Sequence, residues 1–178
     1  MEILRCGIND LDQLHEISCR TFVETYGEDN TPENMKSHLA TVFNKGRLAR
    51  ELLDPKVKYY FANVNGAVVG YLKLNFEGAQ TEIKDNESVE IERIYVLKEH
   101  QGKKIGKCLM DKALEVARSS DKTCIWLGVW ERNVKAIGFY ERNGMKKFGT
   151  HVFRLGAEEQ MDILMRLELT PESVLSHV

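Results

Sequence analysis

Cysteine is scarce in this chain, and its placement excludes two kinds of site. The four cysteines are Cys6, Cys19, Cys108 and Cys124, which are scattered and include no C-x-x-C pair. Such spacing supports neither a disulfide scaffold nor a structural zinc site. The five histidines likewise show no metal-ligand spacing. We therefore expect no metal, and the free thiols suit the reducing cytoplasm.

Long apolar runs are also missing. No stretch approaches the roughly 20 apolar residues that a helix needs to cross a bilayer. The first residues, MEILRCG, contain no basic segment followed by an apolar one, so no secretory signal is visible. We expect a cytoplasmic protein that has no membrane partner.

An excess of basic charge is the third absence. Lysine and arginine together number 25, against 27 aspartates and glutamates, so the formal net charge is −2. Domains whose primary role is to bind nucleic acid usually carry a basic face. We therefore do not expect nucleic acid as a partner.

Two familiar nucleotide-binding motifs are absent as well. The P-loop requires G-x-x-x-x-G-K-[ST], whereas only three residues separate Gly102 from Gly106, and Cys108 stands where the motif needs a hydroxyl. The dinucleotide fingerprint G-x-G-x-x-G occurs nowhere in the chain. Any phosphate ligand must therefore be held by a different kind of loop.

The pattern of apolar residues and turn signals predicts a mixed α/β fold. With 178 residues and 43% hydrophobic content, the chain fits one domain, expected at residues 1–170, and a tail at 171–178. A mixed sheet with helices on both faces follows from the order of the elements. The last expected strand forms an apolar edge of this sheet, and such edges often pair, so a homodimer is an open alternative. The expected strands are 3–6, 58–64, 67–75, 88–96, 123–129, 145–153 and 161–169, and the expected helices are 10–25, 32–43, 46–53, 104–119 and 134–143.

The most informative segment is residues 91–110, IERIYVLKEHQGKKIGKCLM. An apolar strand there runs into a Gln-Gly-Lys-Lys-Ile-Gly loop that opens a helix near Lys104. The first turn of a helix presents unpaired backbone N–H groups, and the aligned peptide dipoles add about half a positive charge. We therefore expect a phosphate site at this loop. The clustered Lys103, Lys104 and Lys107 either meet that phosphate or are ordinary solvated charge.

A second pattern, NVKAIGFYERNGM, follows at residues 133–145. In this order and spacing the two patterns resemble the GNAT (Gcn5-related) N-acetyltransferases, over roughly residues 1–169. The resemblance implies an enzyme with acetyl-CoA as co-substrate, and a mostly antiparallel sheet that contains a splayed parallel strand pair. It places the pyrophosphate on the loop and the pantetheine along the preceding strand. The residues that it implies for acetyl-CoA binding are Ile94, Tyr95, Val96, Gln101, Gly102, Lys103, Lys104, Ile105, Gly106, Lys107, Asn133 and Tyr140.

Several stretches are similar to the PaiA-type members of that family, the bacterial spermidine/spermine N-acetyltransferases. They include TPENMKSHLATVFN at 31–44, IWLGVWERN at 125–133 and a turn at residues 158–160. The likeness implies a polyamine substrate. A peptide N-terminus, another small amine, or a CoA-binding regulatory role with little turnover stay open alternatives.

One departure is that Lys104 replaces the family's first loop glycine. Candidate carboxylates for a polyamine site are Glu24, Glu28, Asp29, the acidic residues of 77–87, Glu158, Glu159 and Asp162.

Two residues are expected to carry the chemistry. Tyr140 has an ordinary pKa near 10, so at neutral pH it holds a proton that it can give to the leaving thiolate. Glu92 is the candidate base, acting directly or through water, because strand alternation would put Glu90, Glu92, Ile94 and Val96 on one face. The structural alternatives are core packing for Tyr140 and a salt bridge for Glu92.

Overall fold

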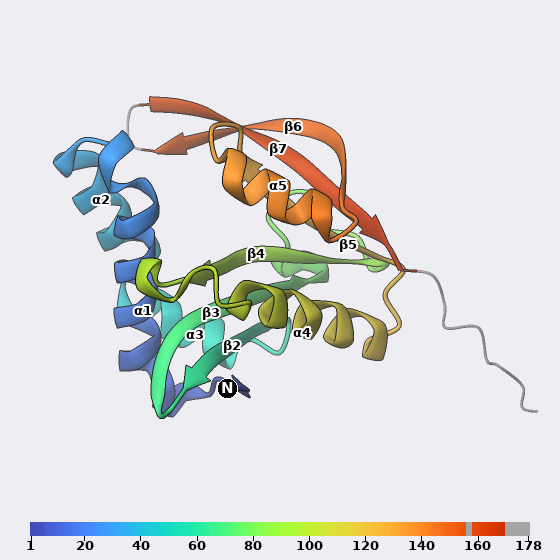
Figure 1. Ribbon diagram of the computed structural model, residues 1–178, viewed down its shortest axis with the longest axis horizontal. Helices are drawn as coiled ribbons and strands as arrows, with labels where there is room; N and C mark the ends of the chain where they lie inside the picture. Colours follow the sequence, from blue (N-terminus) through green and yellow to red (C-terminus); the bar gives the residue numbers. More distant parts are fainter. Residues whose placement is uncertain (156–157, 170–178) are drawn as a thin grey trace, which may run out of the picture.

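The computed structural model describes residues 1–155 and 158–169. Its seven-stranded sheet has the order β1-β2-β3-β4-β5-β7-β6 (Figure 1). Neighbouring strands are antiparallel except β4 and β5, which are parallel. This confirms the predicted mixed, mostly antiparallel sheet. The strands are β1 (Glu2–Arg5), β2 (Val57–Val64), β3 (Ala67–Phe76), β4 (Ser88–Val96), β5 (Cys124–Trp130), β6 (Lys146–Leu155) and β7 (Glu158–Glu168).

Helices cover both faces of the sheet, as predicted (Figure 1). α4 and α5 pack on one face, where Leu109 and Met110 are fully buried. α1 and α3 pack on the other face through Leu14 and Leu48. Each such side chain contributes about 1.5–3 kcal/mol when it is removed from water. The helices are α1 (Leu11–Tyr26), α2 (Pro32–Val42), α3 (Lys45–Leu53), α4 (Ile105–Ser119) and α5 (Val134–Arg142).

Local sequence signals fix several of the element ends. Thr31 caps α2 by accepting a hydrogen bond from the backbone N–H of Asn34 (3.2 Å). Asn65 and Gly66 both have positive φ and form the tight turn between β2 and β3. Gly144, at φ 87°, ends α5 in the left-handed conformation.

A β-bulge interrupts β4. Lys73 of β3 pairs with Arg93, but the next residue, Leu74, pairs with Ile91, so Glu92 is left without a partner across the ladder. An inserted residue of this kind shifts the alternation of side chains by one position. The inward and outward faces of β4 therefore exchange at Glu92.

The expectation that Glu90, Glu92, Ile94 and Val96 share one face is wrong because of this bulge. Ile94 and Val96 pack against the core under α4 and α5. Glu92 and Arg93 point to the opposite side, where the Arg93 guanidinium lies over the ring of Phe43.

The parallel strands β4 and β5 separate soon after they meet. Their ladder consists of the pairs Ser88–Cys124, Val89–Ile125 and Glu90–Trp126. Beyond these pairs both strands continue, to Val96 and to Trp130, without pairing with each other. The predicted splayed parallel pair is thereby confirmed, and it leaves backbone groups of β4 available along the gap.

One local expectation fails at the carboxyl-terminal end. Residues 158–160, expected as a turn, form the start of β7 and pair with β6. Cross-strand pairing with β6 extends the strand across this acidic segment. The expected tail, 171–178, lies outside the described residues.

Candidate active site

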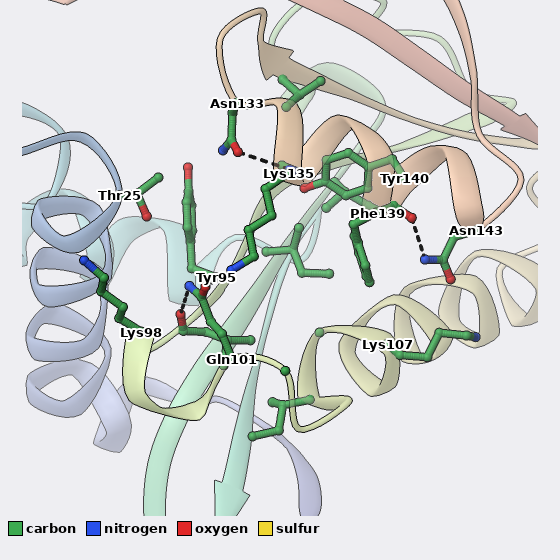
Figure 2. A pocket seen from close by; sticks show the side chains of 18 of the residues that line it. Thr25, Tyr95, Lys98, Gln101, Lys107, Asn133, Lys135, Phe139, Tyr140 and Asn143 are labelled. Carbon is green, nitrogen blue, oxygen red and sulfur yellow. Dashed lines mark hydrogen bonds between the residues drawn. The ribbon is translucent and has the colours of Figure 1, made fainter. Parts of the chain in front are cut away.

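A cleft of about 700 Å³ opens where β4 and β5 separate. Its walls come from the ends of these two strands, the loop before α4, one side of α5 and the last turn of α1. Figure 2 shows Tyr95 and Tyr140 pointing into this space from β4 and α5. The cleft therefore joins the two sequence patterns that stand about forty residues apart.

The loop before α4 presents a row of unpaired amides. Gly102 and Lys104 adopt left-handed conformations, with φ of 77° and 64°. The first helical bond runs from Cys108 N–H to the Lys104 carbonyl (3.1 Å). Within the described part of the chain, the backbone N–H groups of residues 102–107 make no hydrogen bond. This arrangement suits an anion with several oxygens.

Most residues expected at the phosphate loop line the cleft. The exception is Lys103, which does not contribute to its wall. Lys107 extends along α4 and pairs with Asp111. The loop residues that do line the cleft are Gln101, Gly102, Lys104, Ile105, Gly106 and Lys107.

Lys135 is a cleft residue that sequence reasoning missed. It lies in the first turn of α5, where a cation opposes the positive end of the helix dipole and so does not serve helix stability. Its Nζ donates a hydrogen bond to Gln101 Oε1 (2.7 Å), which ties α5 to the phosphate loop (Figure 2). Its position two residues after Asn133, in the second sequence pattern, could have indicated that Lys135 lies at the cleft. Asn133 itself caps α5 by accepting from the N–H of Ala136 (3.1 Å).

Three tyrosines gather beside the gap between the strands. The hydroxyl groups of Tyr26 and Tyr95 lie 3.1 Å apart. Tyr140 is buried, and burial together with the nearby Tyr26 raises the pKa of its hydroxyl well above the ordinary value. Tyr140 therefore keeps its proton across the whole neutral range.

Glu92 lines the cleft but is held by a buried charge network. Its carboxylate accepts from Lys73 Nζ (2.6 Å), Arg93 (3.0 Å) and Asn75 Nδ2 (2.6 Å). Burial opposes its ionisation, but Arg93 and Lys73 outweigh that effect and lower the pKa of Glu92 to about 2. A carboxylate with this pKa is a weak base, and the expected base role stays a prediction.

The acidic candidates for a polyamine site are dispersed. Glu24 lines the cleft, where its carboxylate accepts from the Lys98 N–H (2.7 Å) and pairs with Arg20. Glu82 pairs with His151 (2.9 Å). Glu28 and Asp29 are exposed in the short 3₁₀ turn after α1 and do not line the cleft.

The sequence model of the Acetyltransferase (GNAT) family matches residues 11–145. The chain belongs to this family. The structure supports the same assignment through its splayed β4–β5 pair and its strand–loop–helix arrangement before α4. The predicted resemblance to GNAT N-acetyltransferases is thus confirmed.

Proteins that are similar to this chain in sequence are named as N-acetyltransferases. An uncharacterized N-acetyltransferase of Lactobacillus delbrueckii is 41% identical over 169 residues, covering 95% of this chain and 98% of the relative. An aminoalkylphosphonate N-acetyltransferase of Salmonella typhimurium is 33% identical, with coverage of 82% and 85%. A spermidine N(1)-acetyltransferase of Thermoplasma acidophilum is 24% identical, with coverage of 82% and 88%.

Among solved structures, the PaiA N-acetyltransferase of Thermoplasma acidophilum in complex with coenzyme A has a similar fold. It superposes with a TM-score of 0.79 at 23% identity, covering 94% of this chain and 98% of that chain. Among the residues described in this chain, no helix is long and apolar enough to cross a membrane, and no group of side chains is arranged to hold a metal ion.

Proposed function

We propose that this protein is an acetyl-CoA-dependent N-acetyltransferase that transfers acetyl to a primary amine of a polyamine by direct attack in a ternary complex. The observation that carries the proposal is the row of unpaired amides at 102–107, which opens onto the cleft between β4 and β5. The proposed catalytic domain is residues 1–170, in a cytoplasmic protein whose described cysteines are free thiols. A homodimer stays a prediction.

The residues present fit coenzyme A at both ends of the cleft. The amides of residues 102–107, with Lys104 and Lys107, offer hydrogen-bond donors and positive charge to a diphosphate. The unpaired edge of β4 at Ile94, Tyr95 and Val96 offers backbone groups to an arm that carries amides. Asn133 and Tyr140 line the opposite wall.

In this proposal the thioester supplies the acyl group and a thiolate leaving group. Tyr140 holds the proton for that thiolate, and its hydroxyl faces the cleft from α5 (Figure 2). A backbone N–H near Ile94 or Tyr95 polarises the carbonyl oxygen. Glu92 supplies a fixed negative charge at the floor of the cleft, since its pKa near 2 keeps it ionised.

Aromatic rings gather at the acceptor end of the cleft, and Glu24 and Glu92 are the acidic residues that line its wall among the described residues. The ring of Tyr26 lies 5.9 Å from Trp130 and 6.5 Å from Tyr95, measured between centroids. Electron-rich faces and carboxylates attract ammonium groups. Together with the name of the Thermoplasma spermidine relative, this composition supports a polyamine acceptor.

A second acceptor class has support of its own. The Salmonella relative acts, by its name, on aminoalkylphosphonates. A phosphonate needs a cation near the acceptor end, and Arg132 lies there, with its guanidinium 5.9 Å from the Trp130 ring centroid. An aminoalkylphosphonate is therefore the competing acceptor.

Acceptor profiling separates these possibilities. Release of free thiol from acetyl-CoA is followed with spermidine, spermine, an aminoalkylphosphonate and a peptide amine, alongside calorimetric titration with CoA. We expect CoA binding and the highest kcat/KM with a polyamine. A higher kcat/KM with the phosphonate would show that the acceptor is an aminoalkylphosphonate instead of a polyamine. CoA binding without turnover would indicate a regulatory CoA-binding protein. Absence of binding at millimolar CoA would overturn the proposal.

A further inference from the structure

Asp162 of β7 lies beside Gly128 of the cleft wall, and its carboxylate has no hydrogen-bond or ion-pair partner among the described residues. It pairs across the ladder with Trp130 of β5 and with His151 of β6. Its Oδ2 lies 3.3 Å from the position that a Cβ atom would take at Gly128, an exposed residue of the cleft wall. The carboxylate therefore occupies space that a side chain at position 128 would otherwise fill.

The side chain of Asp162 is half-buried and uncompensated. Among the described residues it has no hydrogen-bond or ion-pair partner, in contrast to Glu92 with its three donors. His151 faces Asp162 across the β6–β7 ladder, but its imidazole is paired with Glu82 (2.9 Å). Burial raises the pKa of Asp162 to about 6, against the opposing effect of His151. Such a carboxyl changes its charge close to neutral pH.

Tyr26 of α1 connects Asp162 with the tyrosine cluster. Burial, and in addition the charge of Asp162, raise the pKa of the Tyr26 hydroxyl. Tyr26 in turn raises the pKa of Tyr140 and lies 3.1 Å from the hydroxyl of Tyr95. The charge of Asp162 thus affects Tyr26, and Tyr26 in turn affects Tyr140.

We propose that Asp162 takes the proton from the acceptor ammonium in the acetyl transfer. This inference rests on the proposed function. The N–H proton passes to Asp162, and the resulting neutral amine attacks the acetyl carbon, so that a C–N bond forms as the C–S bond breaks. Tyr140 gives its proton to the thiolate and regains one from the acetylated nitrogen, and Asp162 returns its proton to solvent.

Other carboxylates near the cleft are less suited to this step. Glu92 is fixed by Lys73, Arg93 and Asn75. Glu24 accepts from a backbone N–H and pairs with Arg20. A base must have a free lone pair and a pKa near the working pH, and Asp162 has both.

The pH profile of kcat/KM for spermidine tests the inference, with Asp162→Asn compared against Asp12→Asn, an exposed residue at the start of α1. Wild type and Asp12→Asn should gain activity through an acidic limb centred near pH 6. Asp162→Asn should lose about 10²–10⁴-fold at pH 7 and lose that limb. Its CoA affinity should be unchanged, and its thermal midpoint at pH 8 should be equal or higher, because a buried charge is removed.

Two outcomes contradict the inference, and they are distinguishable. If wild type acetylates spermidine and Asp162→Asn does so within threefold with the acidic limb intact, Asp162 is not the base and the proposed function stands. If wild type releases no thiol with any amine, the proposed function fails and the base assignment fails with it. A destabilised Asp162→Asn protein, with a lower thermal midpoint and weaker CoA binding, shows a structural role and also overturns the assignment.

Discussion

Lys135 and Gln101, which are 34 residues apart in the sequence, are joined by a hydrogen bond of 2.7 Å between Nζ and Oε1. The other end of the Gln101 amide donates to the Val96 carbonyl (3.1 Å). Gln101 thus links the end of β4 to the first turn of α5 across the mouth of the cleft. The ammonium group of Lys135 is held where a diphosphate on the loop would meet it.

Replacement of Lys135 by alanine should weaken CoA binding by about tenfold, the effect of losing one charge-assisted hydrogen bond. Titration calorimetry with CoA measures this change, and pantetheine, which lacks the diphosphate, should bind both proteins equally. Lys36→Ala, an exposed lysine on α2, is the matched control. Equal weakening for pantetheine would show that Lys135 acts on the fold of the loop instead of the phosphates.

Replacement of Tyr140 by phenylalanine should lower kcat by about 10²–10⁴-fold, because the thiolate loses its proton donor. The fold should survive, since the Tyr140 hydroxyl has no hydrogen-bond partner among the described residues. Rapid-mixing kinetics with saturating donor separates the chemical step from binding. Because the pKa of Tyr140 is raised, wild type should show no alkaline limb from this group below pH 9. Full turnover by the variant would remove Tyr140 from the mechanism.

Replacement of Glu92 by glutamine should destabilise the protein by about 3–5 kcal/mol, because Lys73 and Arg93 are then left buried without a full counter-charge. Urea unfolding measures the loss. Glu115→Gln, at an exposed pair on α4, should change stability by less than about 1 kcal/mol. If Glu92→Gln lowers the free energy of unfolding no more than Glu115→Gln does, the charge network around Glu92 contributes little to stability.

The same residue predicts a pH dependence of stability. The pKa of Glu92 is about 2 in the folded protein, below its ordinary value of 4.5, so the unfolded state binds more protons between these values. The stabilisation is present above pH 4.5 and is lost as the pH falls toward 2. Urea unfolding from pH 7 to pH 3 should therefore show a steeper loss for wild type than for Glu92→Gln. Parallel curves would contradict the low pKa.

Lys104 allows a test of what its side chain does at a left-handed position. Lys104→Ala and Lys104→Gly both remove the ammonium group, but only glycine adopts φ of 64° without strain. If the ammonium meets a phosphate, both variants should bind CoA more weakly by a similar factor, about threefold to tenfold. Weaker binding by the alanine variant alone would assign the effect to the backbone. Unchanged affinity in both would make Lys104 ordinary surface charge.

Elements set by neighbouring residues could be predicted from the sequence. The Asn65-Gly66 turn, the Thr31 cap and the bounds of β4 follow from local preferences that operate within a few residues. The strand, the glycine-containing loop and the helix start at residues 88–119 belong to the same class because all are local, whereas the phosphate-binding role of that loop stays a prediction.

Features that depend on partners distant in sequence could not be predicted. The bulge at Glu92 exists only in the register with β3, and without that register strict alternation was the natural expectation. The meeting of Tyr26 with Tyr95, and the position of Asp162 over Gly128, require α1, β4, β5 and β7 to be placed in space.

The short ladder between β4 and β5 has a consequence beyond catalysis. Among the described residues, three residue pairs join β4 to β5, so the two halves of the sheet share a narrow seam. A donor molecule lying along the open part of that seam would bridge the halves and stabilise the folded state to which it binds. Resistance to proteolysis would then rise with the concentration of acyl donor, as the reaction rate does. Protein without bound donor would be cleaved faster than protein with bound donor.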